Sequence, residues 1–324
     1  MPQLTSYFEK ACSNVEPEAD DVSNASAAHQ EVRDVLHADE TLASWKIDSC
    51  LIGSYDRHVS IRRIKDVDVF CRLPGVDTSD SSRQVLGEVV RVLRAKYDAR
   101  VEPQDRSVKV QFPDFDLHVD AVPARPCGDD WEIPDHSERS VNWQKTNPLE
   151  LATLTTTMNA ENAKLYVPVV KLVRQTRRAN LGKRPGGLYF EILTYHAFAA
   201  GCSGSLPERY VGALASIADQ LEAVVAGGDV EDPSMEGEVI TVRATDQQMR
   251  TAATVFRGLA SRAQAALDSK TDECKAAAEF RAILGQRSDD NTWVFDLPEY
   301  CNEDGTTKYT EKGLSYVPGE GRFA

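Results

Sequence analysis

Short runs in which apolar and polar residues alternate dominate the first 150 residues and predict β-strands. The residues that we expect in strands are 45–52, 64–73, 107–112 and 115–122. Only Pro113-Asp114 separates the last two runs, which favours a hairpin. Two stretches instead carry apolar side chains at helical spacing: residues 26–45, with Ser26 as the capping residue, and residues 82–96. This part of the chain is therefore predicted to be a mixed β-sheet with helices.

The pattern changes near residue 150, after which apolar positions recur as they do in amphipathic helices. The helices expected there are 149–163, 167–179, 189–200, 210–225, 246–269 and 273–284. Residues 238–243 suggest a short edge strand among them. The sequence thus predicts an α+β protein of two lobes, with a mixed-sheet core in residues 1–150, a helical lobe in residues 151–300 and a tail in residues 301–324.

In three segments the apolar residues follow neither strand nor helix spacing. Residues 1–25 are polar and acidic, and we expect a loose arm there. Residues 123–148, which include Trp131 and Trp143, are expected to form a long loop. Residues 306–324 are rich in Gly, Lys and Glu and are expected to be weakly ordered. These segments are therefore left outside the predicted sheet and helices.

The composition is that of an ordinary globular protein, with 41% hydrophobic and 27% charged residues in 324. No apolar stretch approaches the ~20 residues of a membrane span, and the N-terminus lacks the basic and apolar segments of a secretory signal. The seven cysteines have no zinc-site spacing. We expect most of them to be small buried thiols in a reducing compartment. These features favour a cytoplasmic protein without a membrane partner.

Three acidic residues stand out because apolar side chains flank them. Asp66 and Asp68 are two residues apart in a strand, so they point to one face while Val67 and Val69 point to the other, into the core. Asp120 lies in a later strand with the same alternation. We therefore expect the three carboxylates to converge on one face of the sheet.

Carboxylates gathered on one face repel one another unless cations lie between them. Mg²⁺ suits such a set because it accepts a few carboxylates and keeps its other positions for water and phosphate; Mn²⁺ is an alternative. Two ions about 3.5–4 Å apart can stabilise both the attacking and the leaving oxygen of a phosphoryl displacement. We expect Asp66 and Asp68 to hold both ions. Asp120 is expected to complete the coordination of the ion that binds the attacking hydroxyl.

Phosphate-binding candidates lie both before and after the acids. Gly53 lets the backbone approach a phosphate closely, and Ser54 can donate its hydroxyl and N–H to it. A basic stretch that contains no acid follows in the second half: Lys171, Arg174, Arg177, Arg178, Lys183 and Arg184. The formal charge of −14 argues against a broad surface for duplex DNA or tRNA. The basic stretch is therefore either a solvated helix face or a local patch that faces a polyphosphate.

Gly53-Ser54, Asp66-Val-Asp68 and Val119-Asp120 resemble the signature of the DNA polymerase β-like nucleotidyltransferase superfamily. Further segments resemble the bacterial cGAS/DncV-like nucleotidyltransferases (CD-NTases), which are relatives of animal cyclic GMP-AMP synthase. These segments are Asp120-Ala-Val-Pro123, Trp143-Gln-Lys-Thr-Asn-Pro148, Val167-Pro-Val-Val-Lys-Leu-Val-Arg174 and Gly187-Leu-Tyr-Phe-Glu191. The resemblance spans roughly residues 30–290.

The resemblance implies a two-lobed, Mg²⁺-dependent enzyme that makes cyclic di- or trinucleotides from nucleoside triphosphates, in a cleft between its lobes. The product would be a second messenger of the anti-phage systems called CBASS, where it activates a separate effector. By the match, Gly53 and Ser54 bind triphosphate, and Asp66, Asp68 and Asp120 bind two Mg²⁺ ions.

The same match extends to less distinctive positions. A phosphate-binding lysine of the helical lobe falls on Lys171 or Arg174, and counting from Pro168 favours Arg174. Ser60 is expected to replace a threonine that family members often carry where Val59 stands. Some family members are joined to other proteins through their C-terminus, so the tail is either the site of a regulatory partner or an ordinary frayed terminus. The zinc-binding insertion of the animal DNA sensor is absent from the sequence, so no duplex DNA activator is expected.

Two aromatic or titratable side chains near these motifs keep open interpretations. Tyr189 is either a base-stacking residue or an ordinary half-buried aromatic. His118 shares the face of Asp120, where it either approaches the site or is a hydrogen-bonded sheet histidine.

Two other functions also stay open. A superfamily member that modifies RNA or protein would carry the same acids, although the negative charge disfavours tRNA. An inactive nucleotide-binding regulator would keep the fold, but the presence of all three acids argues against it. The nucleobases, ring size and linkage of a product cannot be read from these motifs.

Overall fold

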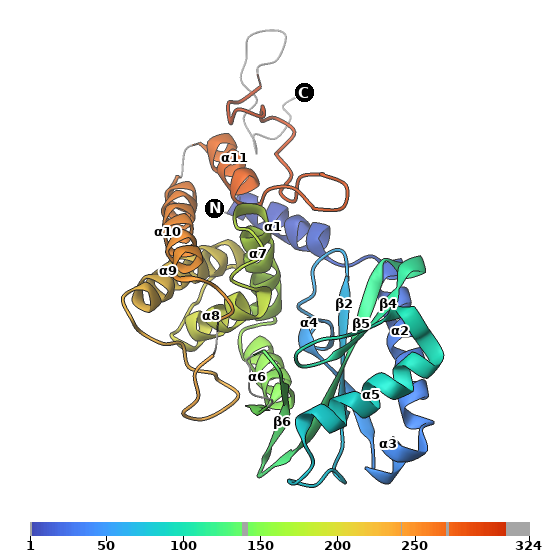
Figure 1. Ribbon diagram of the computed structural model, residues 1–324. Helices are drawn as coiled ribbons and strands as arrows, with labels where there is room; N and C mark the ends of the chain where they lie inside the picture. The colour runs from blue at the N-terminus through green and yellow to red at the C-terminus, as the bar shows by residue number, and fades with distance from the viewer. Residues whose placement is uncertain (1, 138–141, 241, 270–271, 309–324) are drawn as a thin grey trace. The chain divides into compact units, whose positions relative to one another are not determined.

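The computed structural model describes residues 2–137, 142–240, 242–269 and 272–308, and its chain divides into two compact units (Figure 1). We call them the sheet unit and the helical unit. The sheet unit comprises Pro17–Thr157 and Asp232–Glu238. The helical unit comprises Met1–Glu16, Met158–Glu231 and Val239–Ala324. The chain thus enters the helical unit first, which the consecutive ranges expected from the sequence did not anticipate.

The sheet unit contains a seven-stranded sheet, in which five strands lie in the order β1-β2-β5-β4-β3. These strands are β1 (Asp48–Ile52), β2 (Asp66–Arg72), β3 (Val101–Pro103), β4 (Val108–Phe112) and β5 (Leu117–Cys127). Strands β2 and β5 are parallel neighbours, whereas β1–β2, β4–β5 and β3–β4 pair antiparallel. The predicted α+β class with a mixed sheet is therefore confirmed, and β4 and β5 form the expected hairpin.

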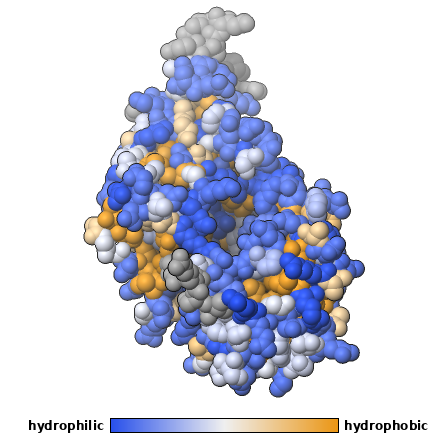
Figure 2. All heavy atoms as spheres, in the orientation of Figure 1, coloured by the Kyte–Doolittle hydropathy of each residue, from blue (hydrophilic) through white to orange (hydrophobic). Residues whose placement is uncertain are grey.

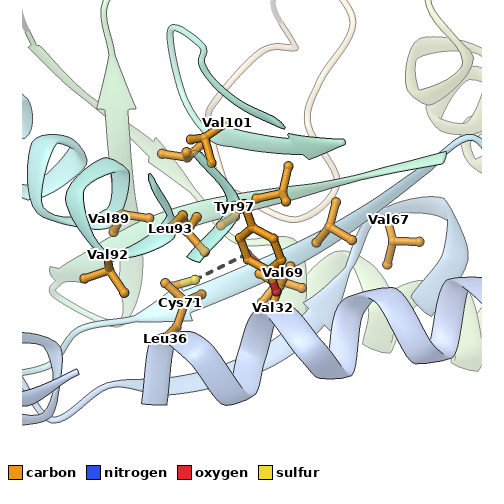
Figure 3. Packing of buried hydrophobic residues seen from close by; sticks show 14 of the residues in the cluster. Val32, Leu36, Val67, Val69, Cys71, Val89, Val92, Leu93, Tyr97 and Val101 are labelled. Atoms are coloured by element: carbon orange, nitrogen blue, oxygen red, sulfur yellow. Dashed lines mark hydrogen bonds between the residues drawn. The ribbon is translucent and has the colours of Figure 1, made fainter. Parts of the chain in front are cut away.

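Two helices, α2 (Ala19–His37) and α5 (Ser82–Tyr97), pack on one face of this sheet. Figure 3 shows side chains of both helices around Val67 and Val69 of β2. Those labelled from the helices are Val32 and Leu36 of α2 and Val89, Val92, Leu93 and Tyr97 of α5. Because Val67 and Val69 are fully buried, the residues that alternate with them in β2 must point to the opposite face.

Helix α2 begins earlier than the sequence pattern suggested. Glu18 and Asp21 form a capping box at its start, so the prediction that Ser26 caps a helix over residues 26–45 is wrong. Two of the residues that α2 buries near this end, Ala25 and Ala28, are small. They give little hydrophobic signal against the surrounding acids. A short helix, α3 (Glu40–Ser44), capped by Asp39, follows it.

The long loop expected over residues 123–148 is also wrong. Strand β5 continues past residue 122 and pairs with β6 (Asp130–Asp135), which pairs with β7 (Asn142–Thr146). The Trp131 ring packs edge-on against buried Phe70, with ring centroids 5.9 Å apart. Pro126 and Pro134 interrupt the sequence pattern, since proline normally argues against a strand. The Trp131–Phe70 contact, which the sequence pattern does not reveal, packs β6 against β2.

In the helical unit the expected helices are confirmed to within a few residues. They are α7 (Tyr166–Asn180), α8 (Gly187–Ala199), α9 (Leu206–Val225), α10 (Asp246–Asp268) and α11 (Glu273–Leu284), while α6 (Pro148–Glu161) contains the boundary between the units. The edge strand expected at residues 238–243 is not found in the described residues of that segment, where Val239 makes only an isolated bridge with Glu231. Weak order was expected over residues 306–324, but Thr307 makes a bridge with Cys301; residues 309–324 lie outside the described residues.

The N-terminal segment is a helix, α1 (Pro2–Val15), and not the loose arm that we expected. Its residues Leu4, Phe8, Ala11 and Val15 are buried and follow helical spacing. Phe8 enters an aromatic cluster of the helical unit, where its ring lies 4.8 Å from Phe280. Acidic residues after position 15 dominate the composition of residues 1–25, and they concealed this apolar stripe.

Two of the cysteines are joined, which corrects the expectation for them. Cys274 of α11 and Cys301 form a disulfide across 27 residues, whereas the remaining five are free thiols. Among the free thiols only Cys71 is fully buried. The disulfide holds the segment after α11 against that helix.

Cys301→Ser is expected to lower the free energy of unfolding by about 3 kcal/mol, because a crosslink over a loop of this length restricts the unfolded chain. Urea unfolding of the oxidised protein and the variant measures the difference. The control is the same comparison under a thiol reductant, where the two curves should coincide. Equal stability of oxidised protein and variant would contradict the prediction.

The face of the protein seen in Figure 2 is mostly hydrophilic, with separate hydrophobic patches. Within the described part of the chain, no helix combines the length and the apolar character needed to cross a bilayer.

Candidate active site

The three acids lie on the face of the sheet that α2 and α5 leave uncovered. In the parallel pair of β2 and β5, Asp68 is directly opposite Asp120, and Asp66 is directly opposite His118. Residues in register on neighbouring strands project to the same side of a sheet. Asp68 and Asp120 are therefore cross-strand neighbours, and Asp66 is one step along the same face. The convergence expected from the sequence thus follows from the register.

Asp68 has the strongest electrostatic perturbation of the three. Burial and the nearby carboxylates of Asp66 and Asp120 raise its pKa to about 7, and Arg57 opposes this shift. Arg57 is itself buried and follows the turn that carries Gly53. The raised pKa means that the site accumulates negative charge at a free-energy cost, which an added cation would relieve.

Gly53 begins a single helical turn, α4 (Gly53–Asp56), directly after β1. It adopts a positive φ of 78°, and a Cβ atom there would lie 2.0 Å from the Asp68 Oδ2 atom. Both observations require glycine at this position. The turn therefore lies against the carboxylate that the neighbouring strand supplies.

Ser54 and Ser60 close the loop that follows this turn. Their hydroxyl oxygens are 3.0 Å apart, and the backbone N–H of Ser60 donates to the Ser54 carbonyl over 3.0 Å. Ser60 is buried, and Val59, its neighbour, is fully buried. Ser60 therefore supports Ser54 through its hydroxyl.

The carboxylate of Asp120 has a side-chain contact on each oxygen. Ser107 donates from its hydroxyl to Oδ1 over 3.2 Å, and the Nε2 atom of His118 lies 3.3 Å from Oδ2. His118 was expected on this face, whereas Ser107 was not among the expected site residues. Ser107 alternates with Lys109 and Gln111 in the sequence, but its approach to Asp120 depends on how β4 pairs with β5.

A basic loop runs from α4 to β2 and is tied to acids of the sheet unit. Arg62 forms an ion pair with Glu18, and Lys65 forms one with Asp116. Asp116 follows a short 3₁₀ turn, η2 (Pro113–Phe115), and has a left-handed φ of 51°. The expectation that residues 115–122 form one strand is therefore wrong for its first two residues.

The remaining candidates belong to the helical unit. The Nζ atom of Lys171 lies 2.6 Å from both carboxylate oxygens of Glu16. Arg174 contacts the buried carboxylate of Glu191 at 3.4 Å, and its guanidinium would lie 3.2 Å from a Cβ placed on Gly187. Tyr189 is buried, and this burial raises its pKa to about 12. Their roles toward a nucleotide stay predictions.

Lys171→Met is expected to lower the free energy of unfolding by about 1–2 kcal/mol, because the charge-assisted contact with Glu16 is lost. Urea unfolding measures this effect. The matched control is Lys183→Met, which changes an exposed lysine of the same unit and should have little effect. If both variants unfold at the same urea concentration, the Glu16 contact does not stabilise the protein.

The donor set suits a hard divalent cation, because Asp66, Asp68 and Asp120 offer only carboxylate oxygens. The raised pKa of Asp68 is the observation that fits such a cation. Among the residues that the structure describes, no three histidine, cysteine or acidic side chains are already arranged around a common ion position.

The parallel strands with opposed aspartates, the third aspartate two residues away and the adjoining Gly-Ser turn are the arrangement that the sequence motifs led us to expect of a nucleotidyltransferase. Residues 2–159 match the model of the Second Messenger Oligonucleotide or Dinucleotide Synthetase domain. A cyclic AMP-AMP-AMP synthase from an Acinetobacter species is 29% identical over 289 residues, which cover 85% of this chain and 82% of the relative.

Solved structures agree on the fold. The Bradyrhizobium diazoefficiens CD-NTase CdnG, in complex with GTP, has a TM-score of 0.68 at 15% identity, covering 86% of this chain and 96% of that one. An Escherichia coli CdnC:HORMA complex has a TM-score of 0.65 at 17% identity, covering 85% and 95%. Residues 2–159 thus match a second-messenger synthetase domain, and the chain is similar to the bacterial cGAS/DncV-like nucleotidyltransferases, the CD-NTases, as its motifs indicated.

Proposed function

We propose that this enzyme joins nucleoside triphosphates into a cyclic oligonucleotide with the help of two Mg²⁺ ions. The observation that carries the proposal is the register that sets Asp68 opposite Asp120, beside the Gly53 turn. When bound there, Mg²⁺ would lower the pKa of an attacking ribose hydroxyl and offset charge on the triphosphate. Mn²⁺ has the same ligand preferences and is an alternative.

We assign ion binding and triphosphate binding to different residues of the chain. Asp66 and Asp68 would hold both ions. Asp120 would complete the coordination of the ion on the side of the attacking hydroxyl. Ser54 would bind the triphosphate with its hydroxyl and N–H, with Ser60 orienting that hydroxyl. Arg174, or Lys171 in its place, would bind phosphate, and Tyr189 would stack on a base.

The identity of the product is proposed from the relative. Since the Acinetobacter enzyme is a cyclic AMP-AMP-AMP synthase, ATP is the first substrate to test and a ring of three AMP units is the expected product.

The test is to incubate the protein with Mg²⁺ and ATP, or with all four ribonucleoside triphosphates, without RNA, DNA or a second protein. Products are treated with phosphatase and identified by mass spectrometry. A phosphatase-resistant product with the mass of cyclic tri-AMP supports the proposal. A different cyclic product would change only the nucleobases or ring size.

A second function is tested by the same preparation. Transfer of labelled nucleotide to added RNA or protein, with no cyclic product, would instead support a superfamily member that modifies a polymer. Nucleotide binding without any turnover would support an inactive regulator.

The biological setting is also part of the proposal. We propose that the product acts in the cytoplasm as a second messenger of CBASS defence and activates a separate effector protein. A regulatory partner is proposed at the C-terminal tail. The CdnC:HORMA complex supports regulation by a protein partner in a related enzyme.

A further inference from the structure

Three strands of the sheet unit place a defined set of polar side chains around Asp120. In the register of β2, β5 and β4, one row across the sheet is Asp68, Asp120 and Lys109. The adjacent row is Asp66, His118 and Gln111. Residues within each row face the same side. His118 therefore stands beside two of the three acids, next to Asp66 across the strands and next to Asp120 along its own strand.

Separate local structures fix the backbone of the two residues that contact Asp120. The N–H of His118 donates to the Lys65 carbonyl over 2.9 Å, which ties it to the start of β2. Ser107 closes a turn in which its carbonyl accepts from the Gln104 N–H over 2.8 Å. Both backbone positions are therefore set independently of the Asp120 side chain.

We propose that His118 and Ser107 are positioning residues that orient the Asp120 carboxylate for the cation on the side of the attacking hydroxyl. This inference rests on the metal site of the proposed function. Ser107 donates to Oδ1 at 3.2 Å, and His118 approaches Oδ2 at 3.3 Å. Both side chains act through Asp120, and neither is assigned a contact with substrate or metal.

The physical basis is that a carboxylate on a single bond rotates unless its oxygens have partners. Each carboxylate oxygen can accept more than one contact, so Asp120 keeps acceptor capacity for a cation after Ser107 and His118 are engaged. Asp120 and His118 are largely buried, with side chains 17% and 25% exposed. These two neighbours supply the side-chain contacts of the carboxylate oxygens.

The experiment measures Mn²⁺ affinity of the full-length protein by electron paramagnetic resonance of the free ion, without nucleotide. His118→Phe and Ser107→Ala are each expected to weaken Mn²⁺ binding by about 10-fold, the usual effect of losing a group that orients a metal ligand. His118→Gln, which keeps a donor near the Nε2 position, and Ser107→Thr, which keeps the hydroxyl, should bind Mn²⁺ nearly as the unchanged protein does.

The decisive control repeats His118→Phe in an Asp120→Asn background. If His118 acts through the Asp120 carboxylate, adding His118→Phe to Asp120→Asn should not weaken Mn²⁺ binding further. A further loss there, or unchanged affinity of His118→Phe alone, overturns the role of His118. Thermal melting checks the fold. If His118→Phe is unstable, Ser107→Ala against Ser107→Thr decides, and equal affinities of these two overturn the proposal.

One more variant separates this inference from the proposed function. Asp66→Asn with Asp68→Asn should abolish specific Mn²⁺ binding. If it does not, the proposed metal site itself is wrong. If it does, but the His118 and Ser107 variants bind Mn²⁺ normally, only the positioning role fails.

Discussion

Asp68→Asn is expected to reduce nucleotidyl transfer by about 10³-fold or more, because the side chain proposed to contact both cations loses its charge and metal-ion stabilisation contributes several kcal/mol. The same change should stabilise the metal-free fold near pH 8. There the half-buried Asp68 carboxylate is ionised beside Asp66 and Asp120, and asparagine removes that repulsion. Product formation by mass spectrometry and urea unfolding in a chelator measure the two effects.

The pH dependence follows from the direction of the Asp68 pKa shift. Its pKa rises from 3.8 to about 7 in the folded protein, so between these values the folded state binds more protons than the unfolded state. The contribution of this group to stability therefore falls as pH rises from about 4 to 7 and is constant above that. The stability difference between pH 5 and pH 8 should be smaller in Asp68→Asn.

Asp116→Asn is the control for this difference. Lys65 lowers the pKa of Asp116, so Asp116 is ionised in both the folded and the unfolded state between pH 5 and 8. The variant should keep the pH dependence of the unchanged protein. If Asp68→Asn also keeps it, or if it retains full activity, the electrostatic description of the site is wrong.

Gly53→Ala is expected to lower the rate of nucleotidyl transfer by about 10²-fold, because displacing a catalytic group by about 1 Å has an effect of this size. The added Cβ would lie 2.0 Å from Asp68 Oδ2, so the turn or the carboxylate must move. The measurement is the turnover number with saturating ATP and Mg²⁺.

A matched control isolates this contact from backbone strain. Gly128 lies in the same unit, also has a positive φ (64°), and has no neighbouring atom within 4 Å of the place that an added Cβ would take. Gly128→Ala should therefore share the conformational strain, about 1 kcal/mol, and retain turnover. Equal turnover of the two variants would mean that the contact with Asp68 is not what makes Gly53 necessary.

Local patterns were sufficient for the acidic pair and for most helices. Alternation in β2 placed Asp66 and Asp68 on one face and Val67 on the other, since the period of a strand is fixed by its backbone. The same reasoning located α5 and the helices after residue 150. It failed where small or interrupting residues weakened the pattern, as at Ala25 in α2 and at Pro126 in β5.

Contacts between distant parts of the chain could not be predicted in this way. The placement of Phe8 against Phe280 and the pairing of Cys274 with Cys301 each join segments through packing. Lys171 and Glu16, which are 155 residues apart, meet for the same reason. Periodicity reports which side of an element is apolar, and carries no information on which other element covers it.

The sequence by itself determined the types of side chain at the site, their faces on each strand and the resemblance to the CD-NTases. Only the tertiary structure decided that β2 and β5 pair in parallel with Asp68 opposite Asp120, and that Ser107 and His118 engage the third carboxylate. The physical reason is that a strand encodes its own alternation locally, whereas its partner and register depend on how the whole sheet packs beneath its helices.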